Sequence, residues 1–156
     1  MYFSNLIRIS VSSSQSARLH SMTKAIPQIQ KYMTTQPHSI GSDQKIVQAE
    51  KMMREHSFRH LPVLDGSKVV GLLSDRDIKL VEILKDADPN KLCVSDVMRE
   101  DVFSVSPNAL LNDVCLEMAE KKYGSAVVVD NQKLVGIFTE VDAMRALSEL
   151  LTGRLG

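Results

Sequence analysis

Two stretches of the chain carry nearly the same pattern of apolar and polar positions. The first, VVGLLSDRD, covers residues 69–77, and the second, LVGIFTEVD, covers residues 134–142. In each, apolar residues flank a glycine, a Ser or Thr follows, and an Asp comes three residues later. A shift of 65 residues, the distance from Ser74 to Thr139, aligns them without a gap. It also pairs Met33 with Met98, Met53 with Met118, Val63 with Val128 and Asp65 with Asp130. Such a fixed period indicates a duplicated supersecondary unit.

Each copy shows the same succession of predicted elements. In the first copy, a short extended piece at 37–40 precedes a stretch at 43–56 whose apolar residues recur at helical spacing. Two apolar runs within 60–74, split by the turn sequence DGSK, indicate a β-hairpin. A second helix is expected from residue 75. The chain is therefore predicted to have a mixed α/β (α+β) fold, with two tandem β-α-β-β-α repeats related by a pseudo-two-fold axis and clefts between them.

The repeat also sets the expected domain limits. We place a first repeat at 27–86, a linker at 87–93, a second repeat at 94–151 and a C-terminal tail at 152–156. The segment 1–22 is rich in Ser and contains no Asp or Glu. It is interpreted as a flexible tail, as sequence ahead of a true start at Met22, or as a transit peptide, and we keep it out of the fold.

Composition narrows the function classes. The 156 residues contain 19 basic and 19 acidic side chains, so bulk charge favours no nucleic-acid or anionic membrane partner. Aromatic residues make up only 4%, with no Trp, which leaves few platforms for base stacking. No apolar run approaches the roughly 20 residues of a membrane span. Cys93 and Cys115 lack the neighbours of a zinc site, so we expect free, partly buried thiols in a reducing compartment and no metal.

The Ser/Thr-x-x-Asp tetrads at Ser74–Asp77 and Thr139–Asp142 have two interpretations. Each lies where a strand ends and a helix begins, and a hydroxyl followed three residues later by a carboxylate resembles a capping box. The same place suits a nucleotide, because a helix N-terminus attracts phosphate and a carboxylate can accept hydrogen bonds from both ribose hydroxyls. The two roles are compatible, and the tetrads alone do not separate them.

The whole unit, taken together, resembles the CBS domain, a family that takes its name from cystathionine β-synthase. The resemblance rests on GLLSDRD and GIFTEVD, on IQKYM and VSDVM at the starts of the two copies, and on RHLPVLD and GSAVVVD. It extends over residues 27–151, and two such units in tandem resemble a Bateman module. The resemblance implies a regulatory, energy-sensing function with an adenosine ligand (AMP, ADP, ATP, NAD(H) or S-adenosylmethionine) bound in clefts between the units.

The resemblance also implies roles for individual residues. Asp77 and Asp142 would take the ribose hydroxyls. Residues that would face ribose or phosphate are Ser74, Thr139, Arg59, His60, Arg76 and Ser125. Residues that would line the base are Ser39, Ile40, Ser104, Val105 and Pro62.

The two copies differ where the phosphate is expected. Arg59 and His60 align with Gly124 and Ser125, and Arg76 aligns with Val141. An Arg can hold a phosphate with two parallel hydrogen bonds, and a protonated His adds charge, whereas Gly-Ser supplies only a hydroxyl and backbone. We therefore expect a tighter nucleotide site where Arg59 and His60 point and a weaker or empty one elsewhere.

No catalytic constellation is found, and we expect a stand-alone regulatory module that is not an enzyme and signals by changing shape or partner. The alternative is a ligand-free oligomerisation or protein-interaction module. The expected macromolecular partners of this protein are a second copy and an unknown regulated protein, with neither nucleic acid nor membrane. We place the protein in the cytoplasm, or in an organelle if residues 1–22 direct import. Apolar candidates for docking helix faces are Met52, Val81, Leu84, Leu116 and Leu147.

Overall fold

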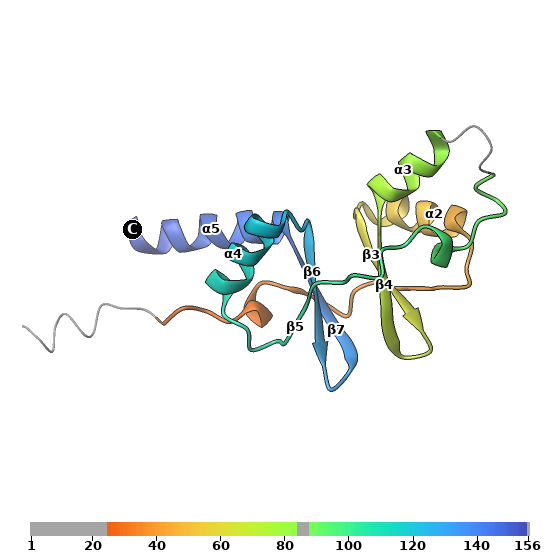
Figure 1. The fold of residues 1–156 in the computed structure, drawn as a ribbon. Helices are drawn as coiled ribbons and strands as arrows, with labels where there is room; N and C mark the ends of the chain where they lie inside the picture. Colours follow the sequence, from red (N-terminus) through yellow and green to blue (C-terminus); the bar gives the residue numbers. More distant parts are fainter. Residues whose placement is uncertain (1–24, 84–87, 156) are drawn as a thin grey trace, which may run out of the picture.

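The computed structural model describes residues 25–83 and 88–155, so the expectations for residues 1–22 and for Leu84 lie outside the described residues. Figure 1 shows two units side by side, each a β-hairpin with two helices at one end. The first unit contains β2 (Ile40–Gly41), α2 (Ile46–His56), β3 (His60–Asp65), β4 (Lys68–Ser74) and α3 (Asp75–Ile83). The second contains β5 (Ser104–Val105), α4 (Leu111–Lys121), β6 (Ser125–Asp130), β7 (Lys133–Thr139) and α5 (Glu140–Leu155). The predicted order β-α-β-β-α, present twice, is confirmed.

The two sheets have matching topology. In the first, the order is β2-β3-β4, with β2 parallel to β3 and β3 antiparallel to β4. In the second, β5, β6 and β7 pair in the same way, and β1 (Thr34–Thr35) adds an antiparallel edge strand beside β7. Even the local irregularities recur at the 65-residue offset. The hairpin register shifts at Val63/Leu64 and at Val128/Val129.

The short helical turn that opens each copy packs on the other unit. The first copy opens with the 3-10 turn η1 (Ile29–Lys31). Its Ile29 side chain is fully buried in the second core, among side chains of α4 and the β6–β7 hairpin. The Ile29 amide donates to the Ala109 carbonyl at 2.8 Å. The matching turn η2 (Val94–Asp96) buries Val94 in the first core, and its amide donates to the Gln44 carbonyl at 2.7 Å. The core of each unit therefore includes one apolar side chain from the opening turn of the other copy.

Some apolar side chains on the outer helices stay exposed. Leu116 on α4 and Leu147 on α5 are 60% and 50% exposed, whereas Met52 and Val81 pack against the first core. The two free cysteines are half-buried, as expected. Within residues 25–83 and 88–155, no helix has the length and apolarity needed to cross a membrane.

Candidate functional site

The two Ser/Thr-x-x-Asp tetrads form identical strand-to-helix corners. At the β4–α3 corner, the Ser74 hydroxyl donates to Oδ2 of Asp77 at 2.5 Å and accepts from the Asp77 amide at 3.2 Å. At the β7–α5 corner, the Thr139 hydroxyl donates to Oδ2 of Asp142 at 2.7 Å and accepts from its amide at 3.4 Å. In each, the backbone amide of the hydroxyl residue also donates to that Oδ2. The helix-capping interpretation is therefore confirmed at both corners, and one carboxylate oxygen is left for other partners.

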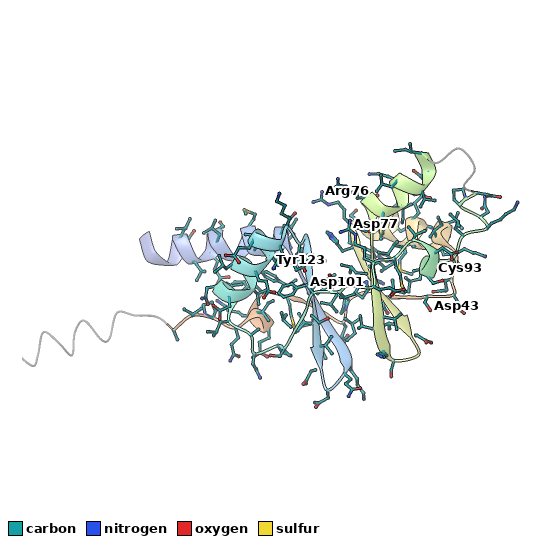
Figure 2. The ribbon with its side chains drawn as sticks, in the orientation of Figure 1. Asp43, Arg76, Asp77, Cys93, Asp101 and Tyr123 are labelled. Carbon is teal, nitrogen blue, oxygen red and sulfur yellow. The ribbon has the colours of Figure 1, made fainter. Side chains whose placement is uncertain are left out.

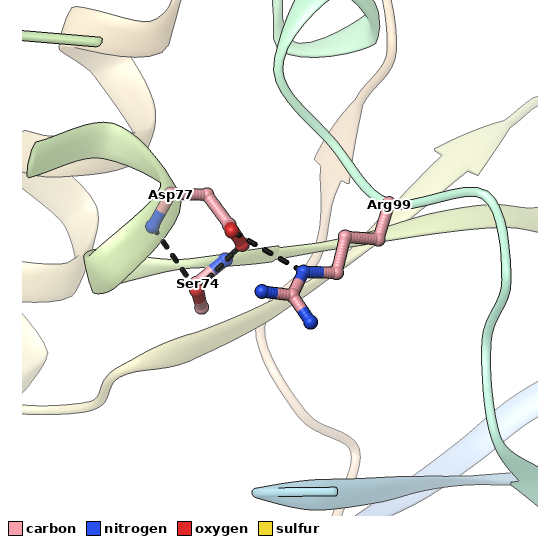
Figure 3. Close-up of polar contacts among 3 residues, drawn as sticks. All are labelled: Ser74, Asp77 and Arg99. Atoms are coloured by element: carbon pink, nitrogen blue, oxygen red, sulfur yellow. Dashed lines mark hydrogen bonds and ion pairs between the residues drawn. The ribbon is translucent and has the colours of Figure 1, made fainter. Parts of the chain in front are cut away.

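That second oxygen faces an arginine in both corners. Asp77 and Asp142 are 8% and 5% exposed, so each carboxylate has little contact with solvent. Oδ1 of Asp77 lies 3.3 Å from Nε of Arg99. A dashed line marks this ion pair in Figure 3. Oδ1 of Asp142 lies 3.3 Å from a guanidinium nitrogen of Arg145, one turn further along α5. Both guanidinium groups are largely exposed, although the two carboxylates that they contact are buried.

A cavity of about 580 Å³ opens at the second corner and is lined by both units. We call it the Asp142 cavity. The second unit contributes Thr139, Asp142 and Arg145, and the first contributes Arg59 and His60. The rest of the described wall comes from Thr34, Thr35, Gln36, Pro37, His38, His56, Ser57, Phe58, Gly124, Ile137, Glu140 and Val141. Its volume is in the range of small-molecule sites.

The structure thus brings the predicted phosphate residues of one copy to the predicted ribose residues of the other. Arg59 precedes β3 and is exposed, and its carbonyl accepts from the Asp75 amide at 2.9 Å, which fixes the backbone at the cavity rim. His60 begins β3, opposite Ser74 in the ladder. Burial lowers the pKa of His60, and the adjacent Arg59 lowers it further. His60 therefore favours the neutral form near pH 7, and Arg59 supplies the lasting positive charge.

A stack of rings covers one side of the same cavity. The rings of His38 and His56 stack with centroids 4.1 Å apart, and the Phe58 ring stacks on both, at 5.5 Å and 5.9 Å. Sequence reasoning missed this group, because His38 and His56 are 18 positions apart and neither fits a catalytic motif. A flat π-surface of this kind suits stacking by a planar base. Arg145 was missed as well, although its position three residues after Asp142 on a helix is a usable signal.

Other predicted site residues lie away from this cavity. Ile40 and Pro62 are buried, and Ser39, Ser104 and Val105 do not line it; instead, the preceding segment 34–38 forms this part of the wall. Ser125 is 3% exposed. Among the residues that the structure describes, its hydroxyl is the buried side-chain polar atom that has no hydrogen-bond partner. Arg76 is exposed at the start of α3, next to Asp77 and facing the second unit (Figure 2). As ligand contacts, these seven residues remain predictions.

The arrangement offers recognition groups. It joins a carboxylate able to accept from a diol, a hydroxyl at a helix start, an arginine and an aromatic wall, all around one cavity. No group of three or more His, Cys, Asp or Glu side chains suited to a metal ion occurs among residues 25–83 and 88–155.

The comparisons with known proteins agree on one family. The CBS domain family matches residues 29–82 and 94–149 of this chain. The chain is 32% identical over 111 residues to hypoxic response protein 1 of Mycobacterium tuberculosis, covering 70% of this chain and 78% of that protein.

Two solved structures have the same fold. The CBS domain pair of protein MJ0100, in complex with 5′-methylthioadenosine and S-adenosyl-L-methionine, superposes with a TM-score of 0.73 at 24% identity. It covers 80% of this chain and 98% of that one. CBSX2 in complex with AMP superposes with a TM-score of 0.72 at 24% identity, over 79% of this chain and 97% of that one.

Proposed function

The chain belongs to the CBS domain family and carries two CBS domains in tandem, and we propose that this pair is a regulatory module that binds an adenosine-containing ligand in the Asp142 cavity. In this proposal the ribose hydroxyls bind Asp142, the Thr139 hydroxyl contacts ribose or phosphate, and Arg59 holds the phosphate. The ring stack of His38, His56 and Phe58 gives the base a planar neighbour.

One observation carries the proposal: Arg59 of one unit and Asp142 of the other line the same cavity. A ligand with a ribose at Asp142 and a phosphate at Arg59 would contact both units at once. Such a ligand would favour the relative placement of the units in which both contacts form, and a differential affinity of this kind is what a signalling ligand requires. Two proteins of the same fold are complexes with AMP and with S-adenosyl-L-methionine, which supports adenosine as the common part of the ligand.

The test is calorimetric titration of the full chain with AMP, ADP, ATP, NADH and S-adenosylmethionine. We expect saturable binding of at least one of them, lost in Asp142→Asn, in which the amide nitrogen can replace the carboxylate oxygen that accepts from ribose. We also expect Arg59→Ala to weaken phosphate-bearing ligands roughly tenfold, the cost of one charge-assisted contact of about 1.4 kcal/mol. Adenosine itself should bind Arg59→Ala and the unchanged protein alike.

A matched variant controls for the loss of charge. Arg54→Ala removes an arginine from the exposed face of α2, where it pairs with Glu50 and does not line the Asp142 cavity. It should leave every titration unchanged. Failure of all five ligands to bind the unchanged protein would overturn the proposal.

The exposed apolar side chains of α4 and α5 support a second part of the proposal, self-association. Leu116, Met144, Leu147 and Leu151 are each about half exposed or more. Apolar groups left exposed on neighbouring helices favour pairing through those helices. We propose a homodimer that regulates another protein and has no catalytic activity of its own. Analytical ultracentrifugation of Leu147→Glu against the unchanged chain tests the dimer, since a buried Glu at the interface would shift the equilibrium to monomer.

A further inference from the structure

We propose that Arg99 closes the second ribose site, so that the CBS pair holds one nucleoside, at Asp142, and the Asp77 corner acts as a structural corner only. This inference rests on the proposed function and specifies how many ligands the pair takes. It arises from the ion pair in Figure 3, where the Arg99 guanidinium lies on the only carboxylate oxygen of Asp77 that its cap leaves open.

The equivalent position in the other cleft is Thr34. The Thr34 Cα faces Ile137 on β7, and Arg99 bridges in the same antiparallel manner to Leu72 on β4, with both hydrogen bonds at 2.9 Å. A Cβ built on Gly136 would meet the Sδ atom of Met33 and the Thr34 carbonyl. A Cβ built on Gly71 would likewise meet Met98 and the Arg99 carbonyl. Thr34 and Arg99 therefore occupy the same place in the two clefts.

The difference in length between these two side chains has a direct consequence. Thr34 lines the Asp142 cavity and leaves it open. Arg99 starts from the equivalent point, and its side chain reaches Asp77, with Nε 3.3 Å from Oδ1. Because two hydrogen bonds fix the Arg99 backbone to β4, its side chain always starts beside Asp77, where Thr34 places only a hydroxyl and a methyl group in the other copy. Arg145, in contrast, starts from the same helix as Asp142, three residues later, and not from the strand side of the cavity.

The remaining contacts of the Asp77 cleft also differ from those of the Asp142 cavity. Gly124 and Ser125 stand in place of Arg59 and His60, so the Asp77 side has no arginine at the position equivalent to Arg59. Asp101 stands in place of Gln36, which adds a carboxylate where the Asp142 cavity has an amide. The stacked pair Phe103 and Tyr123, with centroids 5.2 Å apart, does occupy the positions of His38 and Phe58. The aromatic pair is therefore kept, and the arginine ahead of the hairpin is not; the exposed cation beside Asp77 is Arg76, which aligns with Val141 of the Asp142 cavity wall.

The experiment exchanges the two side chains and counts ligands by calorimetry on the full chain, with AMP and adenosine as probes. The unchanged chain should bind one probe molecule per chain. Arg99→Thr should bind two molecules of adenosine, and adding Asp77→Asn should return the count to one. The reverse exchange, Thr34→Arg, should weaken AMP and adenosine at Asp142 by at least about tenfold, because the new guanidinium competes with the ribose for the carboxylate.

Two variants control for charge away from the clefts. Ser67→Arg, in the exposed turn between β3 and β4, adds the same charge as Thr34→Arg, and Arg54→Thr removes the same charge as Arg99→Thr. Neither should change the count or the affinity. A count of two in the unchanged chain, or a count that stays at one in Arg99→Thr, overturns the inference and leaves the proposed function standing. No binding of AMP or adenosine to any variant, with none of the other ligands binding either, overturns the proposed function and this inference with it.

Discussion

The imidazole of His60 lies against the backbone of Gly124, across the boundary between the two units. A methyl group at Gly124 would lie 2.8 Å from Nε2 of His60 and 3.1 Å from its Cε1. Position 124 is the equivalent of Arg59, so a side chain is present at this site in one copy and absent in the other. The contact explains the asymmetry: the His60 ring occupies the space that a side chain at Gly124 would need.

Gly124→Ala should therefore reduce stability. The half-buried His60 ring has to move, and overpacking of this kind costs about 1–3 kcal/mol of the free energy of unfolding. Urea denaturation of the variant measures the loss. In a His60→Ala background, Gly124→Ala should cost much less, because the contact with the His60 ring is then absent. The comparison is between His60→Ala and the double variant His60→Ala/Gly124→Ala. Additive losses in the two single variants and the double variant would contradict this account of the glycine.

The two helix caps should contribute equally to stability but differ in ligand binding. Ser74→Ala and Thr139→Ala each remove the hydroxyl of a cap, at a cost of about 1 kcal/mol in the free energy of unfolding. Thr139→Ser keeps the oxygen and should be close to neutral. Because only Thr139 lines the Asp142 cavity, Thr139→Ala should also weaken AMP, whereas Ser74→Ala should not. Urea denaturation and calorimetry on the same samples measure both effects, and an equal change in AMP affinity would argue against a single site.

Weakening the contact between the opening turn η1 and the core of the second unit should destabilise the whole pair. Ile29 is fully buried against the second unit, and an Ile-to-Ala change in such a core costs about 2–5 kcal/mol. Ile26→Ala is the matched control, since that side chain is 51% exposed and should change stability little. Urea denaturation of both variants provides the comparison. Equal stability of Ile29→Ala and Ile26→Ala would mean that the turn does not hold the two units together.

Much of the fold could be predicted from the repeat alone. The helices at Ile46–His56 and Leu111–Lys121, the two hairpins and both capped corners fall at the 65-residue offset, since equivalent sequences make the same local hydrogen bonds. Hydrogen bonds of this local kind depend on residues that are close together in the sequence. Asp77 and Asp142, the two candidates for ribose binding, belong to such local motifs and can therefore be identified from the sequence.

The exchange of the opening turns could not be predicted in this way. Ile29 and Val94 are equally apolar and fit either core, and an internal repeat identifies equivalent residues without saying which unit each contacts. The composite cavity follows from that exchange, because the segment 34–38 reaches the second unit before the chain returns to the first. The ring stack and the Arg99 ion pair are tertiary contacts of the same origin.

Stability should fall with acid because of His60. Its pKa is lowered in the folded chain from an ordinary value of 6.5, by burial first and by Arg59 second, although Glu140 and Asp77 oppose the shift and Arg99 adds to it. Below pH 6.5 the unfolded chain therefore binds a proton that the folded chain does not. The free energy of unfolding should decrease as pH falls from 7 toward the folded pKa, by up to about 1.4 kcal/mol per pH unit for one proton.

His60→Gln should flatten this slope, because no group with a lowered pKa then remains at that position. Urea denaturation at pH 7.5, 6.5 and 5.5 and constant ionic strength measures it. His56→Gln is the matched control: it removes an exposed imidazole from the same cavity wall and leaves His60, and the contribution of His60 to the slope, in place. A bound phosphate near His60 should favour its protonated form, so saturating AMP should reduce the acid sensitivity of the unchanged chain and not that of His60→Gln. An identical slope in His60→Gln and the unchanged chain would assign the acid sensitivity to other groups.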